Sequence, residues 1–245
     1  MKKTRIETIN ELKKELSDIE NLYKSKCVNW TGTTSNTNEL YSEIIANELL
    51  RELKEFDKIS TVTRTETYCR ENHCNIEIDI CNSNRDEENF AKRITGLTVD
   101  GLGLIKDFQI PLKDTRANKG LGKFDLISFN EETKTLYLIE LKYEGNKETL
   151  LRASLESYTY YKIVDKTKLI NDYFNNRKFI LNKVYNQIDP TEINVKSAVL
   201  VVPKCIAYNE LEEVELGGRP KLKALVLALD IKYFTLEIYT NETIL

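Results

Sequence analysis

Residues 123–129 read KFDLISF, residues 130–134 read NEETK, and residues 135–142 read TLYLIELK. Two runs of alternating or continuous apolar residues around a short polar segment predict a β-hairpin. The second run is apolar on both faces up to position 140, which is typical of a strand buried inside a sheet. We therefore expect the second strand of this hairpin to lie at the centre of the fold.

The hairpin carries three side chains that could form a catalytic site. Successive residues of a strand point to opposite faces, so Glu140 and Lys142 share one face and emerge together where the strand leaves the core. Asp125 lies on the paired strand. Carboxylates are suitable ligands for Mg²⁺, and the carbonyl of Leu141 would point toward the same metal. Lys142 could orient or deprotonate a water, or offset negative charge on a phosphate.

Helices are predicted on both sides of the hairpin. Apolar residues at helical spacing predict one helix over residues 38–56, which carries Glu39, Glu43 and Glu48. A second helix is predicted over residues 147–164. Its polar stripe repeats every four residues and consists of Arg152, Glu156 and Tyr160. Because this helix directly follows the hairpin, we interpret its polar stripe as a candidate substrate-binding surface.

The rest of the chain alternates between predicted helices and strands. Sequence patterns predict helices over residues 4–26 and 220–229, a charged loop with a short helix over residues 84–95, and strands over residues 59–69, 75–81, 104–112, 196–203 and 233–239. We expect residues 114–122 to form a flexible approach to the hairpin, which with Lys123 offers Arg116 and Lys119 as phosphate contacts. It is no P-loop, because Phe124 stands where that motif needs Ser or Thr.

Composition bounds the class of protein. The chain has 245 residues, 41% hydrophobic and 31% charged, and a net charge of −3, which describes a globular α/β protein without bulk positive charge for nucleic acid. A local basic patch and an acidic metal site remain compatible with a nuclease. The first residues are charged, and no run is long and apolar enough to span a membrane, so we expect a cytoplasmic protein.

A zinc site is the weaker metal hypothesis. Cys69, His73, Cys74 and Cys81 lie near one another in the sequence, but there is neither a CxxC pair nor a second half at zinc-finger spacing. His73 is the only histidine, so catalysis by a Ser–His or Cys–His pair is disfavoured.

Asp125, then Glu140-Leu-Lys142, between a leading and a following helix, resembles the PD-(D/E)xK nuclease superfamily. This resemblance implies a restriction-endonuclease-like fold: an α/β (α+β) protein with an αβββαβ core, whose mixed central sheet is flanked by helices. We expect a single domain over residues 1–245. Residues 1–35 would be a helical extension, residues 36–205 the core, and residues 206–245 an added helix and strand.

The resemblance also implies roles for individual residues. It implies that Asp125 and Glu140 bind Mg²⁺ or Mn²⁺ and that Lys142 is catalytic. It often places a further acid on the leading helix, for which Glu43 is our choice, with Glu39 and Glu48 as rivals. Some members carry a Gln-xxx-Tyr pair on the following helix. Glu156 and Tyr160 have that spacing, with Glu in place of Gln, and Phe124 stands in place of the proline of the motif.

The sequence therefore favours a metal-dependent nuclease that hydrolyses phosphodiester bonds of DNA, in a defence, restriction or repair setting. A catalytically inactive nucleic-acid-binding or assembly module on the same fold is one alternative. A nuclease for RNA or single strands is another. A homodimer is plausible, because many enzymes of this fold pair to cut two strands.

Overall fold

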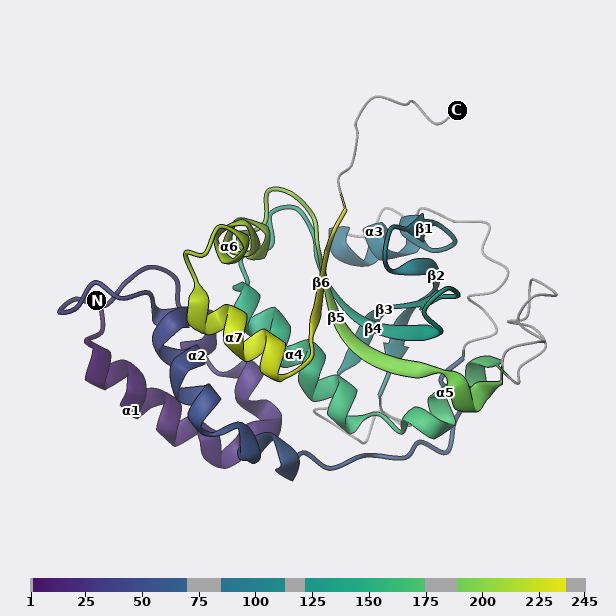
Figure 1. Ribbon diagram of the computed structural model, residues 1–245, viewed down its shortest axis with the longest axis horizontal. Coiled ribbons are helices and arrows are strands. Elements are labelled where there is room, and N and C mark those ends of the chain that lie inside the picture. Colours follow the sequence, from purple (N-terminus) through teal and green to yellow (C-terminus); the bar gives the residue numbers. More distant parts are fainter. Residues whose placement is uncertain (1, 70–84, 113–121, 175–188, 237–245) are drawn as a thin grey trace.

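The computed structural model describes residues 2–69, 85–112, 122–174 and 189–236. Within these ranges the protein is a mixed α/β fold built on a six-stranded sheet with the order β1-β2-β3-β4-β5-β6 (Figure 1). The strands are β1 (Thr98–Val99), β2 (Gly103–Pro111), β3 (Lys123–Asn130), β4 (Thr135–Lys142), β5 (Asn194–Val201) and β6 (Lys232–Thr235). Strands adjacent in the sheet are thus consecutive in the sequence.

The sheet changes direction of pairing at β4. The strands β1 to β4 pair antiparallel, whereas β4 with β5 and β5 with β6 pair parallel. The crossover from β4 to β5 carries α4 (Leu150–Ile163) and α5 (Lys166–Phe174), as a parallel connection requires. All eight residues of β4 are buried, and both of its edges are paired. The prediction of a buried hairpin strand at the centre of the sheet is confirmed.

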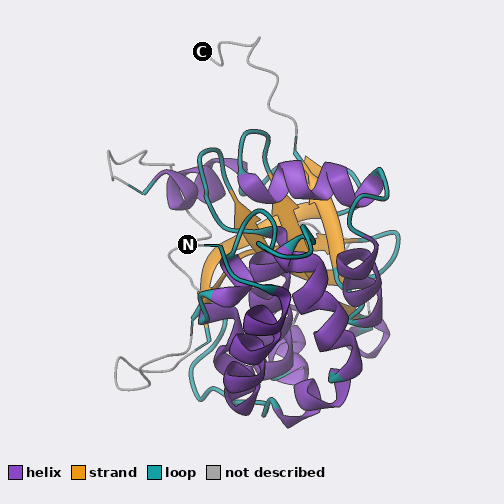
Figure 2. Ribbon diagram, turned by 90° about the vertical axis from the view of Figure 1, so that its left-hand side faces the viewer, coloured by secondary structure: helices purple, strands orange, loops and turns teal. Residues whose placement is uncertain are grey.

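Helices cover both faces of the sheet. Figure 1 shows α4 and the N- and C-terminal helices on one side of β5 and β6, and α3 on the other, and Figure 2 views the thicker helical layer with the strands behind it. The remaining helices are α1 (Arg5–Glu15), η1 (Leu16–Lys24), η2 (Cys27–Asn29), α2 (Tyr41–Arg51), η3 (Leu53–Lys58), α3 (Asp86–Ile94), η6 (Pro190–Glu192), α6 (Ile206–Glu215) and α7 (Pro220–Ala228), where η denotes a 3₁₀ helix.

The side chains of β4 divide between two hydrophobic cores. Leu136 and Leu138 join the larger core under α4, and Ile139 and Leu141 join the smaller core under α3. The predicted alternation along this strand is therefore correct. Glu140 continues the row on the side of α4, which explains how a carboxylate comes to lie at the end of an apolar strand face.

The N-terminal segment packs on the larger core. Thr4 and Glu7 form a capping box at the start of α1. The α-helix predicted over residues 4–26 is shorter in the structure. It ends at Glu15, and a tighter 3₁₀ helix with a kink at Asp18 (φ −123°, ψ 64°) follows from Leu16. Leu12 belongs to the same hydrophobic core as Ile231 near the other end of the described chain. Residues outside the expected core region 36–205 thus help to build one interior.

Two other expectations about secondary structure need correction. The segment 59–69 forms no strand, because Val62 donates its N–H to the carbonyl of Ile163 (2.7 Å) and so pairs with the end of α4 instead of with a second strand. Its expected partner, 75–81, lies outside the described residues. The helix α6 was not predicted from the sequence, which placed one helix, over residues 220–229, and one strand after residue 205.

Within the described ranges, none of the helices combines the length and the apolar character needed to cross a membrane.

Candidate active site

The candidate site lies where β3 and β4 separate. Their ladder runs from Asn130 opposite Thr135 to Leu126 opposite Ile139, and it stops there. Beyond this point the two strands are joined by a side chain: Asp125 Oδ2 accepts the backbone N–H of Leu141 (2.9 Å). A side chain thus replaces a ladder hydrogen bond, and this leaves the end of the hairpin open for polar groups.

Gln109 on β2 supports Asp125 from the other side. Its Nε2 donates to Asp125 Oδ1 (3.0 Å), and its backbone is left-handed, with φ 52°. The neighbours Phe108 and Ile110 pack into opposite cores, so the alternation of β2 breaks at this residue. On β3 the neighbours of Asp125 are divided in the same way, with Phe124 in the larger core and Leu126 in the smaller core. Paired irregularities in adjacent strands therefore set the direction of the Asp125 carboxylate.

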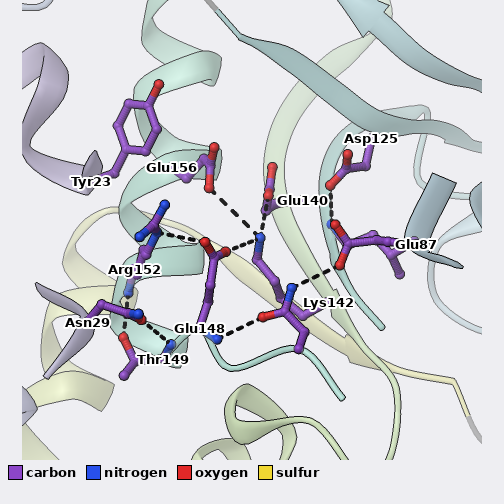
Figure 3. A network of polar contacts seen from close by, with 12 residues as sticks. Tyr23, Asn29, Glu87, Asp125, Glu140, Lys142, Glu148, Thr149, Arg152 and Glu156 are labelled. Atoms are coloured by element: carbon purple, nitrogen blue, oxygen red, sulfur yellow. Dashed lines mark hydrogen bonds and ion pairs between the residues drawn. The ribbon is translucent and has the colours of Figure 1, made fainter. Parts of the chain in front are cut away.

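Lys142 lies among three carboxylates, which we call the carboxylate cluster: Glu140, Glu148 and Glu156. Its Nζ lies 2.7 Å from Glu140 Oε1, 2.6 Å from Glu148 Oε2 and 3.8 Å from Glu156 Oε2 (Figure 3). The Lys142 side chain is only 3% exposed. One oxygen from each carboxylate lies within 4.8 Å of the others, which is close enough for one cation to contact all three.

Burial and charge shift the protonation of these groups. Burial, the Asp125 carboxylate and the Glu156 carboxylate raise the pKa of Glu140 well above its usual value. Burial also raises the pKa of Asp125 to about 6, and the Lys142 ammonium only partly offsets this effect. Burial alone would lower the pKa of Lys142, but the surrounding carboxylates outweigh it and hold that pKa well above its usual value. Lys142 is therefore a cation at neutral pH.

A bound cation would favour the ionised form of each acid at this site. Fully ionised, the three carboxylates and Asp125 would contribute four negative charges, against one positive charge each on Lys142 and Arg152, so two negative charges would remain uncompensated. The Arg152 guanidinium lies 3.0 Å from Glu148 Oε1, without the alignment of a hydrogen bond. Carboxylate oxygens with a surplus of two negative charges match the preferences of a divalent cation such as Mg²⁺.

The start of α4 holds Glu148 in place. Thr149 caps the helix by accepting the N–H of Arg152 (3.2 Å). Thr149 in turn donates its own N–H to Asn29 Oδ1 (2.8 Å) and its hydroxyl to the carbonyl of Val28 (2.7 Å). The N-terminal segment therefore anchors the turn that carries Glu148, as the labelled residues in Figure 3 show.

A chain of hydroxyl groups orients Glu156. The Tyr160 hydroxyl donates to Glu156 Oε1 (2.9 Å), and the Tyr23 hydroxyl lies 3.1 Å from that of Tyr160. Burial and the Glu156 carboxylate raise the pKa of Tyr160 far above its usual value, so its hydroxyl stays protonated and can donate. Gly122 makes room for this tyrosine, because a Cβ at that position would lie 1.9 Å from the hydroxyl oxygen.

The predicted site residues on the hairpin strands and on the helix that follows them lie together. The acid predicted on the leading helix, Glu43, does not join them. Asp125, Glu140 and Lys142 meet Arg152, Glu156 and Tyr160 across the interface of β4 and α4. The structure supports no such role for Glu43. Both of its carboxylate oxygens accept backbone N–H groups at the start of α7, from Lys221 and Leu222, each at 2.9 Å. Its chemistry is that of a helix cap supplied by another helix.

The rivals of Glu43 also have other partners. Glu39 pairs with Arg5 (3.2 Å), and Glu48 pairs with Arg51 on the next turn of α2 (2.8 Å). Within the described residues, the carboxylates that gather around Lys142 come from β4, from the turn before α4 and from α4 itself. Glu148 takes the place that the sequence interpretation gave to an acid on the leading helix.

We expect Glu43→Ala to lower the free energy of unfolding by about 1–2 kcal/mol, because two N–H groups at the start of α7 lose their acceptor. Urea unfolding measures this loss, and cleavage rates of the folded variant should equal those of the unchanged protein. Glu212→Ala, on the exposed face of α6, is the matched control. A large fall in cleavage rate without loss of stability would instead place Glu43 in the active site.

The predicted phosphate contacts have separate outcomes. Lys123 is half-exposed at the start of β3, and its Nζ lies 3.8 Å from Glu88 of α3. Arg116 and Lys119 lie outside the described residues. Of the residues considered for zinc, Cys69 is buried, and the other three also lie outside the described residues. Phosphate binding by Lys123, Arg116 and Lys119 therefore stays a prediction.

Three residues near the site were missed from the sequence. Glu148 lies within the helix predicted over residues 147–164 and has the four-residue spacing of its polar stripe, but we began that stripe at Arg152. Gln109 was hidden inside an apolar run. Glu87 on α3 accepts hydrogen bonds from the N–H of Tyr143 (3.3 Å) and from Asn146 Nδ2 (3.1 Å), and its charge contributes to the raised pKa of Asp125. Only the spacing of Glu148 and Arg152, four residues apart, could have suggested a pair.

The raised pKa of Asp125 predicts a pH dependence of stability. Because the folded state holds this proton more tightly than the unfolded state, metal-free stability falls as the pH rises from about 4 to about 6. The shift of roughly two pH units corresponds to about 3 kcal/mol. In Asp125→Asn the fall should be smaller by about this amount, which thermal unfolding in metal-free buffers would measure. An equally steep fall in the variant would contradict the assignment to Asp125.

Comparisons of this chain with protein-family models, with curated proteins and with solved structures found no match. The argument for function therefore depends on the geometry of the site and on the chemistry of its residues.

Proposed function

We propose that the chain is a metal-dependent nuclease that hydrolyses phosphodiester bonds of DNA. The observation that carries this proposal is the meeting of Asp125, Glu140 and Lys142 at the open end of the hairpin. Two further carboxylates of the cluster lie against the same lysine. A dense group of buried acids around one cation costs stability, which is typical of a catalytic site and unusual for a merely structural one.

The residues present fit a divalent metal ion. Glu140, Glu148 and Glu156 would hold it with hard oxygen ligands, and Asp125 lies beside Glu140 as a fourth acid. Gln109 Oε1, a buried oxygen beside Asp125 with no hydrogen-bond partner among the described residues, is a further potential donor. When bound, Mg²⁺ would supply an activated water and neutralise charge on the phosphate.

The protonated state of Lys142 favours one of its two predicted roles. In the metal-free protein the surrounding carboxylates hold the pKa of Lys142 well above its usual value, so the lysine is a poor proton acceptor in that state. Its ammonium instead donates hydrogen bonds and offsets the negative charge that develops on the phosphate oxygens. Arg152, ion-paired with Glu148 at the edge of the cluster, contributes positive charge on the same side.

The arrangement of elements supports the same proposal. With the intervening α3, β1, α5 and 3₁₀ helices left aside, the helix α2, the antiparallel strands β2, β3 and β4, the helix α4 and the parallel strand β5 occur in the order αβββαβ. This is the order that the resemblance to PD-(D/E)xK nucleases implies, with Asp125 on the second strand of the core and Glu140 and Lys142 on the third.

The proposal is tested with the purified chain, linear and circular DNA, and single-stranded DNA and RNA. We expect cleavage of DNA with Mg²⁺ or Mn²⁺ and none after chelation with EDTA. Adding metal back should restore the rate and raise the melting temperature of the protein. Binding of DNA without any cleavage, together with no effect of metal on the melting temperature, would favour the inactive binding module.

A further inference from the structure

We propose that a pocket beside the candidate active site binds one unstacked nucleotide of a nucleic-acid strand, with its base against Trp30 and its phosphate at Lys2 and Lys3. We call it the tryptophan pocket. It has a volume of about 410 Å³ and is lined by Lys2, Lys3, Asn29, Trp30, Thr31 and Tyr41. Its assignment as part of a substrate path rests on the proposed function. A base bound there must be out of its stack, so the substrate would be single-stranded or would have a frayed end.

The pocket combines an aromatic wall with positive charge. The half-buried ring of Trp30 packs edge-on against Tyr41, with 5.5 Å between the ring centroids. The ammonium of Lys3 lies 5.9 Å from the centre of the Trp30 ring. Lys2 and Lys3 are exposed, and no carboxylate lines the pocket. Its volume falls within the range of small-ligand sites, roughly 300–1,000 Å³.

The lysines are held in position by the backbone. The N–H of Lys3 donates to the Tyr41 hydroxyl (2.8 Å), and the carbonyl of Lys3 accepts the N–H of Ser35 (2.9 Å). The N–H of Arg5 also donates to Asn36 Oδ1 (3.0 Å). The segment that carries the two lysines is therefore fixed over the tryptophan before any ligand binds, which lowers the entropic cost of binding.

A direct hydrogen bond joins the pocket to the candidate active site. Asn29 lines the pocket, and its Oδ1 accepts the N–H of Thr149, the residue that follows Glu148. Glu148 in turn contacts Lys142 at 2.6 Å. Figure 3 shows Asn29 and Thr149 beneath the carboxylate cluster. A strand seated in the pocket would therefore run close to the cluster, with Asn29 at the boundary between them.

The chemistry of the lining favours a nucleotide over other anions. A phosphate alone would use the lysines but not the indole, and an apolar ligand would use the indole but not the lysines. Proteins that bind single strands combine these two features, since bases stack on aromatic rings while a basic groove follows the phosphates. Another pocket, around Tyr161, also has an aromatic and basic lining, but its Lys162 and Lys196 are paired with Asp57 and Asp230.

Trp30 provides a direct signal for the test, because it is the only tryptophan in the chain. Its fluorescence would be recorded in metal-free buffer, where cleavage does not interfere, while a single-stranded oligothymidylate of roughly ten nucleotides is added. We expect quenching by this oligonucleotide. An abasic strand with the same phosphates should bind more weakly and quench little, and inorganic phosphate should not quench.

Variants separate stacking from charge. Trp30→Ala should weaken binding of a labelled oligonucleotide about 5- to 150-fold, and Trp30→Phe, which keeps an aromatic ring, should weaken it less. Because the two lysines would contact one phosphate, Lys2→Ala with Lys3→Ala should make the salt dependence of log affinity shallower by about 0.7. The exposed pair Lys13→Ala with Lys54→Ala is the matched control and should change neither property.

The outcomes distinguish this inference from the proposed function. Quenching by the oligonucleotide without any nuclease activity would keep the pocket and overturn the proposed function. The pocket alone would be overturned if the protein cleaves DNA but its tryptophan fluorescence does not change on adding the oligonucleotide and the pocket variants bind the oligonucleotide with unchanged affinity. Equal quenching by a polyglutamate peptide would also overturn it, because the site would then recognise acidic chains in general.

Discussion

Glu140→Gln is expected to lower metal-dependent cleavage by about 10³-fold while leaving the protein folded. Glu140 is 5% exposed and contributes an oxygen both to the carboxylate cluster and to the ion pair with Lys142. The substitution removes one negative charge from a proposed metal ligand and keeps the shape of the side chain. Lys142 retains Glu148 and Glu156, so no unpaired buried charge is created.

The same variant should be more stable than the unchanged protein when metal is absent at neutral pH. Glu140 has a pKa well above its usual value because burial and neighbouring carboxylates oppose its ionisation, and the amide needs no ionisation. Thermal unfolding would show a higher melting temperature without Mg²⁺ and a smaller rise when Mg²⁺ is added. Glu144→Gln, an exposed carboxylate paired with Lys204, is the matched control for both assays. Cleavage at the normal rate by Glu140→Gln would refute the assignment of this site.

Lys142→Met is expected to abolish cleavage and yet to strengthen the binding of divalent cations. The ammonium of Lys142 lies among the same three carboxylates that would hold a metal, so the two positive charges compete for them. Its removal relieves the repulsion between ammonium and metal. At an effective dielectric constant of about 20, two unit charges about 4 Å apart interact by roughly 4 kcal/mol, so we expect the affinity for Mn²⁺ to rise at least tenfold.

Without metal, Lys142→Met should be strongly destabilised. Breaking a buried ion pair by removing one partner costs roughly 3–5 kcal/mol, because the carboxylates stay buried without compensation. Calorimetric titration with Mn²⁺ and melting curves with and without metal measure the two opposite effects. Lys142→Arg keeps the charge and should show neither the gain in affinity nor the full loss of stability. Weaker metal binding by Lys142→Met would show that the lysine supports the metal site and does not compete with it.

Local patterns predicted the parts of the site that depend on one strand or one helix. The continuous apolar run along residues 135–141 correctly identified a central strand, because a strand buried on both faces has apolar residues on both. The period of two along this strand correctly placed Glu140 and Lys142 on one face. The spacing of Glu156 and Tyr160 correctly predicted that they meet, since residues four apart share a helix face.

Contacts between distant segments could not be predicted in this way. The carboxylate of Glu43 bonds to α7, which is about 178 residues further along the chain, and no local pattern distinguishes a cap from a metal ligand. The left-handed backbone of Gln109 breaks the strand period beside Asp125, and a glutamine gives no sign of this conformation. Glu148 has the same four-residue spacing as Arg152 and Glu156, but that spacing does not reveal that the turn before α4 brings its carboxylate to Lys142 on β4.

The central position of β4 also determines how the site can move. Since β4 is paired along its length to β5 and over residues 135–139 to β3, and is buried on both faces, opening the whole strand requires breaking hydrogen bonds to two neighbours, and Lys142 itself is paired to β5. The amide protons of β4 should therefore exchange with solvent among the slowest in the chain, through openings close to global unfolding. Glu148 and Arg152, near the start of α4, belong to a more accessible edge. The site thus joins a rigid floor, which carries Glu140 and Lys142, to a rim where a substrate can enter.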